Sequence, residues 1–112
     1  MLHERIYVFE LTAHGPYAIV HAGGELDIAA VDEMRSAVRR GARRAPQVVD
    51  DLRPVTFMDT FALRALLELQ QEASTAMDWS LHVVPGPGVQ RLLDLAGRRD
   101  ELRWISPEQL MD

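Results

Sequence analysis

The sequence predicts an α/β fold in which helices pack on a small mixed β-sheet. Segments with the two-residue alternation of strands take turns along the chain with segments whose apolar residues recur every three or four positions. The predicted order is ββαβαβα(β)α, which favours a layered α/β domain over an all-helical bundle or a β-sandwich. At 112 residues the chain has room for one domain, residues 1–112, and no linker or repeat divides it.

Composition excludes several classes of protein. The chain is 47% hydrophobic and 26% charged, with a mean hydropathy of −0.11, as in an ordinary globular domain. It has no cysteine, which excludes disulfides, thiolate metal sites and cysteine nucleophiles. The net charge of −5, with 12 basic residues that are all arginine, argues against a nucleic-acid ligand and lysine chemistry. No stretch has the length of a membrane span and no signal peptide is visible, so we expect a cytoplasmic protein.

The first half of the chain predicts a hairpin and a helix. Residues Ile6–Leu11 and Tyr17–Val20 alternate around a Gly-Pro turn, which indicates two antiparallel strands. A helix follows its N-cap Asp27, because apolar residues then recur at helical spacing: Ile28, Val31, Met34, Ala37, Val38 and Ala42. Four arginines near its end favour a solvated, dipole-matched terminus: Arg39, Arg40, Arg43 and Arg44.

The run Gln47–Leu52 predicts a central strand that ends where its carboxylates can reach water. Asp50 is unusual in such a strand. If both faces of the strand are covered, one of two consecutive side chains, Asp50 or Asp51, points into packing. Burying a charged carboxylate is costly unless it is paired or protonated.

The second half predicts a long helix, a strand and shorter elements. The pattern over Thr60–Met77 indicates the most buried helix, with a wide apolar face: Phe61, Ala62, Leu63, Ala65, Leu66, Leu67, Leu69, Ala73 and Met77. Trp79–Val84 predicts a strand and Val89–Leu95 a helix closed by Gly97. Leu102–Ile105 predicts a last strand, and Ser106-Pro107-Glu108 starts a short terminal helix.

The segment Val55–Leu63 joins the acidic strand to the long helix and carries the main candidate site. With Asp59 as N-cap, the hydroxyl of Thr60 projects from the first helical position, at the positive end of the helix dipole. A phosphate there would gain free amide donors, yet it would stand beside Asp59 and close to Asp50 and Asp51. By spacing alone an Asp-Thr pair is more often an ordinary cap than a phosphosite.

Four blocks of the sequence, taken in order, are similar to a known family: Gly24-Glu25-Leu26-Asp27, Val48-Val49-Asp50-Asp51-Leu52, Val55-Thr56-Phe57-Met58-Asp59-Thr60 and Val89-Gln90-Arg91-Leu92-Leu93-Asp94-Leu95-Ala96-Gly97. They resemble the signature blocks of the STAS domain, in particular of the bacterial anti-anti-sigma factors, also called anti-sigma factor antagonists. The similarity spans nearly the whole chain. The Phe-Met-Asp-[Ser/Thr] loop is its most specific block.

The resemblance implies a small mixed sheet flanked by helices and a regulatory function. In such proteins the unmodified form binds an anti-sigma factor that is a serine/threonine kinase with a histidine-kinase-like ATP fold, which frees a sigma factor. Phosphorylation of the residue after the loop aspartate breaks that complex, and a phosphatase restores it. By position, Thr60 matches the phosphoacceptor, Asp59 the acidic residue before it, and Asp27 the aspartate of the neighbouring loop. The partner-binding surface expected from this match is Asp27, Met58, Asp59, Thr60, Phe61 and Arg64.

The chain departs from the family pattern next to the acceptor. Phe61-Ala62 replaces the usual Ser/Thr-Gly, and Asp50 stands where an apolar residue is common. Alanine in place of glycine should stiffen a helical first turn by roughly 0.5–1 kcal/mol. Because Leu63, Leu66 and Leu67 already supply a buried stripe, we expect Phe61 to be partly exposed.

Other functions stay open at this stage. A divergent member that binds its partner constitutively, a non-phosphorylated STAS scaffold, or a domain that binds a nucleotide or other anion at the helix start would fit the same fold. Catalysis is disfavoured, because His3, His14, His21 and His82 lack the spacing of a metal site. A Mg²⁺ cluster of Asp50, Asp51 and Asp59 is weakened by the opposite directions of consecutive strand residues. We therefore expect no catalytic residue, metal or cofactor, and no direct contact with nucleic acid or membrane.

Overall fold

The computed structural model describes residues 6–110, so the expectation for His3 falls outside its range. The strands are β1 (Tyr7–His14), β2 (Tyr17–Leu26), β3 (Gln47–Asp51), β4 (Val55–Met58) and β5 (Ser80–Val84). The α-helices are α1 (Val31–Arg44), α2 (Thr60–Ala76) and α3 (Pro87–Ala96), and short 3₁₀ turns are η1 (Ile28–Ala30), η2 (Arg99–Glu101) and η3 (Pro107–Leu110). No helix in this part of the chain has both the length and the hydropathy that crossing a membrane requires.

The five strands form one mixed sheet in the order β1-β2-β3-β5, and β4 pairs with the far end of β2. β1 and β2 form the predicted antiparallel hairpin, with His14 opposite Tyr17 at its turn. All other pairs are parallel: β3 lies between β2 and β5. This arrangement confirms the mixed sheet with helices packed on it that the sequence predicts.

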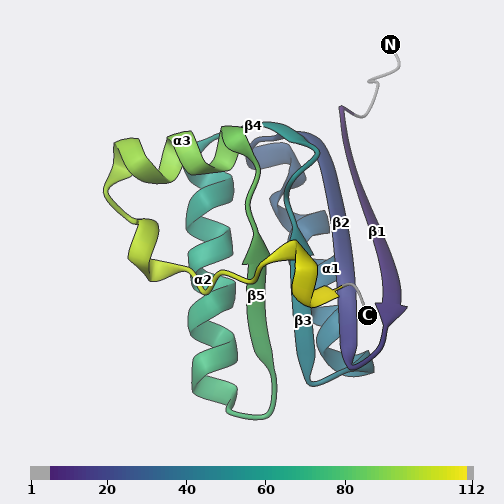
Figure 1. Ribbon diagram of the computed structural model, residues 1–112. Coiled ribbons are helices and arrows are strands. Elements are labelled where there is room, and N and C mark those ends of the chain that lie inside the picture. The colour runs from purple at the N-terminus through teal and green to yellow at the C-terminus, as the bar shows by residue number, and fades with distance from the viewer. Residues whose placement is uncertain (1–5, 111–112) are drawn as a thin grey trace.

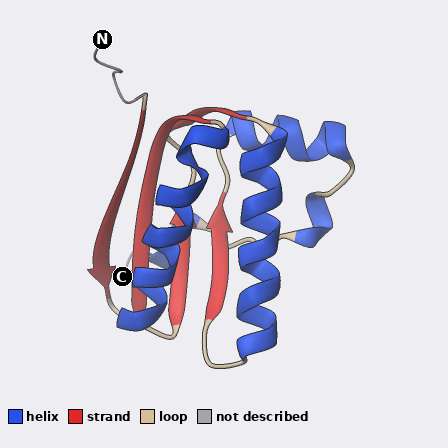
Figure 2. Ribbon diagram, turned by 180° about the vertical axis from the view of Figure 1, so that it is seen from behind, coloured by secondary structure: helices blue, strands red, loops and turns tan. Residues whose placement is uncertain are grey.

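The two longest helices cover one face of the sheet. Figure 1 shows α1 and α2 behind the strands, and Figure 2, seen from behind, shows the two helices side by side across that face. Their apolar stripes meet Val20, Val48 and Leu81 of the strands in the main core. The C-terminal segment crosses the opposite face, where Ile105 and Leu110 bury a smaller cluster.

β2 exchanges one parallel neighbour for another along its length. Its first half, up to His21, pairs with β3, whereas Gly24, Glu25 and Leu26 pair with β4. The register shifts between Gly24 and Glu25, where Gly24 has φ +83°. A Cβ at Gly24 would lie 1.9 Å from the carbonyl oxygen of Ile6, so the bulge requires glycine.

Two strand predictions are wrong. The sequence places Val55–Met58 in a connecting segment, but these residues form β4. Four residues are too short for a clear alternation, and only pairing with β2 makes them a strand. Conversely, Leu102–Ile105 is no full strand: it makes an isolated bridge from Trp104 to Val83.

Several predicted core residues lie at the surface. Ile28 is 62% exposed, because it belongs to η1 and precedes α1. Met77 is 88% exposed and ends α2 in the left-handed conformation rather than continuing it. The prediction that the carboxylates at the end of β3 reach water is also wrong, since Asp50 and Asp51 are both buried.

Candidate functional site

The loops after β2 and β4 lie side by side at one edge of the sheet. In the β2–β4 pair Leu26 is opposite Met58, so the two strands end together. The backbone N–H of Asp59 donates to the carbonyl of Leu26 over 3.0 Å and continues the pairing by one residue. The parallel pairing therefore brings Asp27 and Asp59, which are 32 positions apart in the sequence, to the same edge.

Both aspartates cap a helical turn, as the sequence predicts. The Asp59 Oδ1 atom accepts a hydrogen bond from the backbone N–H of Ala62 at 2.9 Å, and Asp59 itself is extended. The Asp27 Oδ1 atom accepts from the N–H of Ala29, also at 2.9 Å. Each cap satisfies one of the amides that a helix start leaves without an internal partner.

Thr60 is exposed and occupies the first position of α2. Its hydroxyl therefore stands at the positive end of a 17-residue helix, where a negative charge is stabilised. The prediction that Asp50 and Asp51 are close to Thr60 is wrong. Asp51 pairs with His21, five residues before Leu26 on β2, which separates it from the loop by about 16 Å along the strand.

A surface groove of about 300 Å³ runs between η1–α1 and the start of α2. The large apolar side chains on its rim are Phe61, 53% exposed, and Ile28, 62% exposed. Arg64 also lines it, and an ion pair of 2.9 Å between Arg35 and Glu68 joins its walls. The partial exposure of Phe61 that the sequence predicts is thus confirmed.

The structure changes the expected membership of this surface. Met58 is only 3% exposed and packs in the main core, so its side chain is a support of the loop and not a surface contact. Ile28 and Phe57, both more than half exposed, were not among the predicted site residues. The exposure of Ile28 could not be predicted because Ile28 continues the helical apolar pattern, although it lies in η1. The exposure of Phe57 could not be predicted because the sequence does not indicate strand β4. Hereafter the exposed residues Ile28, Thr60, Phe61 and Arg64, with the half-buried caps Asp27 and Asp59, are called the loop surface.

The other ionisable residues considered as candidates in the sequence analysis lie away from the loop surface. Asp51 accepts hydrogen bonds from Nε and Nη2 of Arg53, at 2.9 and 2.8 Å. Burial acts to raise the pKa of Asp51, but the hydrogen bonds from Arg53 outweigh it and hold the pKa below its usual value. Within residues 6–110, no three His, Asp or Glu side chains are arranged to hold a metal ion.

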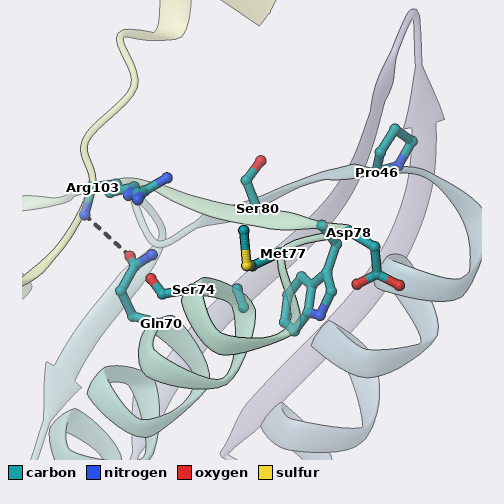
Figure 3. A pocket seen from close by; sticks show the side chains of 9 residues that line it. Pro46, Gln70, Ser74, Met77, Asp78, Ser80 and Arg103 are labelled. Atoms are coloured by element: carbon teal, nitrogen blue, oxygen red, sulfur yellow. Dashed lines mark hydrogen bonds between the residues drawn. The ribbon is translucent and has the colours of Figure 1, made fainter.

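A second cavity, of about 370 Å³, lies at the opposite end of α2 (Figure 3). Gln70 reaches it from α2 and accepts a hydrogen bond from the backbone N–H of Arg103 at 3.1 Å. The amide of Gln70 also donates to the carbonyl of Leu81 on β5. This buried amide therefore fastens the C-terminal segment to the core and is distant from the loop surface.

Comparison with solved structures shows which proteins share this fold. An anti-sigma factor antagonist from Mycobacterium paratuberculosis superposes with a TM-score of 0.74 at 20% identity, over 94% of this chain and 91% of that chain. The unphosphorylated form of the anti-sigma factor antagonist SpoIIAA gives 0.66 at 20% identity, over 94% of each chain. The phosphorylated form of the Bacillus cell fate determinant SpoIIAA gives 0.63 at 17% identity, over 91% and 95%.

The sequence comparisons add the family. No curated protein matches the chain. The profile of the STAS domain, however, matches residues 8–109, from the second residue of β1 into η3. With nearly the whole chain matched, this protein belongs to the STAS domain family.

Proposed function

We propose that this protein is a cytoplasmic anti-sigma factor antagonist, and hence a binding module rather than an enzyme. Unphosphorylated, it binds an anti-sigma factor with serine/threonine kinase activity through the loop surface. Phosphorylation of Thr60 by that kinase releases it, and a phosphatase restores the binding form. Sigma-factor-dependent transcription is regulated in consequence.

One observation carries the proposal: an exposed threonine at the first position of α2, between a capping aspartate and an exposed aromatic ring. The neighbouring Asp27 loop is hydrogen-bonded to this position through Leu26 and Asp59. The fold supports the proposal too, because its structural neighbours include anti-sigma factor antagonists, one of them solved with and without phosphate.

The electrostatics of the loop surface explain how a phosphate would act. It would add about −1.5 to −2 charges at pH 7 next to the carboxylate of Asp59. The amides and dipole at the start of α2 stabilise an anion there, so the domain itself stays folded. A partner fitted to a neutral hydroxyl would instead meet a bulky anion, and binding weakens.

Binding is tested first, by pull-down of the unmodified protein against each kinase-type anti-sigma factor encoded in the source genome. We expect one of them to be retained. Failure with all of them, using protein shown to be folded by circular dichroism, would favour the non-phosphorylated scaffold instead.

Phosphorylation is tested separately with the retained kinase and ATP. We expect intact mass to rise by one phosphate in the wild type and not in Thr60→Ala, which still binds because an exposed hydroxyl contributes little. Thr60→Glu should bind more weakly. Thr56→Ala is the matched control, since Thr56 is an exposed threonine four residues away. This variant keeps Thr60 and should gain one phosphate, as the wild type does. Phosphate found on any residue other than Thr60 would overturn the assignment.

A further inference from the structure

Asp50 is the most unusual polar side chain in the described part of the molecule. It lies in the central strand β3, between Val20 of β2 and Val83 of β5, and none of its surface is exposed. Within residues 6–110, neither of its carboxylate oxygens has a hydrogen-bond partner. Buried polar groups are nearly always hydrogen-bonded, so this carboxyl group calls for an explanation.

The side chain points into the main core, beneath the helices. Val48, two residues earlier on β3, belongs to the core cluster that includes residues of α1 and α2. The pairing of β3 with both neighbours is free of bulges, so Asp50 shares the face of Val48. Val20 and Val83, its partners in register, belong to the same cluster.

The elements packed against this face offer Asp50 no opposite charge. The buried residues of α1 are apolar or glycine, and those of α2 are apolar apart from Gln70. Two pairs of charged side chains on those helices bind each other at the surface, Arg35 with Glu68 and Arg39 with Glu72. The third helix on this core, α3, buries only Val89 and Leu93, and its charged Arg91 and Asp94 are exposed.

The other ionisable groups near Asp50 belong to the opposite face of the sheet. They are Asp51, its partner Arg53, and His21, whose Nδ1 is 3.9 Å from Asp51. His82 alternates with Val83 on β5 and therefore also faces away from Asp50. Burial, and to a smaller degree the negative charge of Asp51, raise the pKa of Asp50 to about 7.

We propose that Asp50 is a proton-linked switch in the core: the folded domain holds this buried, unpartnered carboxyl group protonated, and its ionisation weakens the packing of α1 and α2 on the sheet. A protonated carboxyl is neutral and tolerates burial far better than a carboxylate. The helices α1 and α2 begin next to the loop surface, so a change in how they pack on the sheet would reach that surface.

The sign of the effect follows from proton linkage. In the unfolded chain the pKa of Asp50 has its ordinary value of 3.8, and in the folded chain it is about 7. Below pH 3.8 both states are protonated and the stability is fully present. As pH rises towards 7 only the folded state keeps the proton, so the unfolding equilibrium constant grows about tenfold per pH unit, or about 1.4 kcal/mol. Above pH 7 the loss levels off.

Another group titrates in the same range with the opposite sign. Burial, helped by Arg103, lowers the pKa of His82, so its contribution to stability rises with pH up to its ordinary value of 6.5. The contribution of Asp50 must therefore be isolated as a difference between the wild type and a variant that keeps His82.

The test is urea unfolding of the wild type and Asp50→Asn from pH 4.5 to 8.5. Asparagine has the shape of the protonated acid and does not titrate. We expect the ratio of the two unfolding constants to change about tenfold per unit between pH 5 and 7 and to be constant above pH 7.5. A ratio that is constant throughout would overturn the proposal.

A second variant covers the case in which Asp50→Asn does not fold. Asp50→Val places a strand-forming apolar residue in the same core, and it should be more stable than the wild type at pH 8 by a margin that disappears towards pH 5. A margin independent of pH would contradict the switch. Asp51→Asn is the matched control: it should keep the decline between pH 5 and 7, and loss of that decline would assign it to Asp51 instead.

Two measurements on the wild type are direct. The NMR signal of the Asp50 carboxyl carbon should titrate with a midpoint near pH 7, whereas a midpoint below pH 5 would rule the switch out. Amide hydrogen exchange in α1 and α2, corrected for the intrinsic effect of pH, should be faster at pH 8 than at pH 6. Equal protection at both values would show that ionisation does not loosen these helices.

Discussion

Three consecutive residues at the start of α2 have three different physical roles. Asp59 is extended and caps the helix through Ala62, Thr60 presents a hydroxyl at the positive helix end, and Phe61 turns a half-exposed ring towards the groove. Ala62 is buried in the core at 1% exposure. The departure Phe61-Ala62 from the family pattern thus combines an exposed aromatic contact with a buried methyl group.

Replacement of Phe61 by serine should reduce binding of the anti-sigma factor at least about tenfold, or about 1.4 kcal/mol, because exposed aromatic rings often anchor protein interfaces. The melting temperature should change little, since about half of the ring already contacts water. Titration calorimetry and thermal melting on the same sample measure both quantities.

The control for this experiment is Met77→Ser, which removes an exposed apolar side chain just beyond the far end of α2. Its affinity should equal that of the wild type. A large loss of stability in Phe61→Ser, with unchanged affinity of the folded fraction, would mean that Phe61 serves packing and not the interface.

At the scale of elements, the loop surface depends on the bulge in β2. The bulge at Gly24 lets β2 continue beyond its pairing with β3 and pair with β4. This second pairing places Asp27 beside Asp59. The hydroxyl of Tyr7 on β1 donates a hydrogen bond to the carbonyl of Ala29 at 3.3 Å. This bond ties the turn η1, which follows β2, to β1. Two strands far from α2 in sequence, β1 and β2, therefore help to position the surface around Thr60.

Substitution of Gly24 by alanine tests this dependence. The backbone has a positive φ there, and the new Cβ would lie 1.9 Å from the carbonyl oxygen of Ile6. We expect a loss of at least about 2 kcal/mol in the free energy of unfolding, measured with urea.

Gly15→Ala is a matched control, because Gly15 also has a positive φ, +56°, but nothing lies within 4 Å of its new Cβ. It should show only the backbone penalty, about 1 kcal/mol. Equal losses in the two variants would mean that the contact with Ile6 relaxes freely and that the bulge does not constrain β4.

At the scale of the whole molecule, the sheet separates two adjacent carboxyl groups into opposite surroundings. Asp50 faces the main core without a partner among the described residues, whereas Asp51 faces the other side and binds Arg53. Their pKa values are shifted in opposite directions, upward for Asp50 and downward for Asp51. The combined contribution of these two carboxyl groups to stability should therefore be greatest at mildly acidic pH.

On the acid side of this optimum, the loss of stability comes from protonation of Asp51. Because its pKa in the folded state is below the ordinary 3.8, its contribution is present above pH 3.8 and is lost as the pH falls through the folded value. Asp51→Asn should thus be less stable than the wild type by about 1–3 kcal/mol at pH 7, and the gap should shrink below pH 4. Urea unfolding at pH 3 and 7 checks it; a gap of the same size at both values would contradict a charge-dependent bond.

The sequence by itself determined the fold class, the hairpin, the three α-helices and the two aspartate caps. These features depend on local periodicity, turn residues and the first turn of each helix, all of which can be read within about ten positions. The partial exposure of Phe61 could also be predicted, since its neighbours already filled the buried stripe of α2.

Only the tertiary structure decided the rest. Val55–Met58 becomes a strand, and Asp27 comes to lie beside Asp59, because β2 continues past β3 and accepts β4 across a glycine bulge. The exposure of Ile28 and the burial of Met58 follow from which elements cover them. Asp50 is isolated because the one buried polar side chain on α2, Gln70, binds Leu81 and Arg103 instead. Such properties arise between residues distant in sequence, where pairing and burial override local pattern.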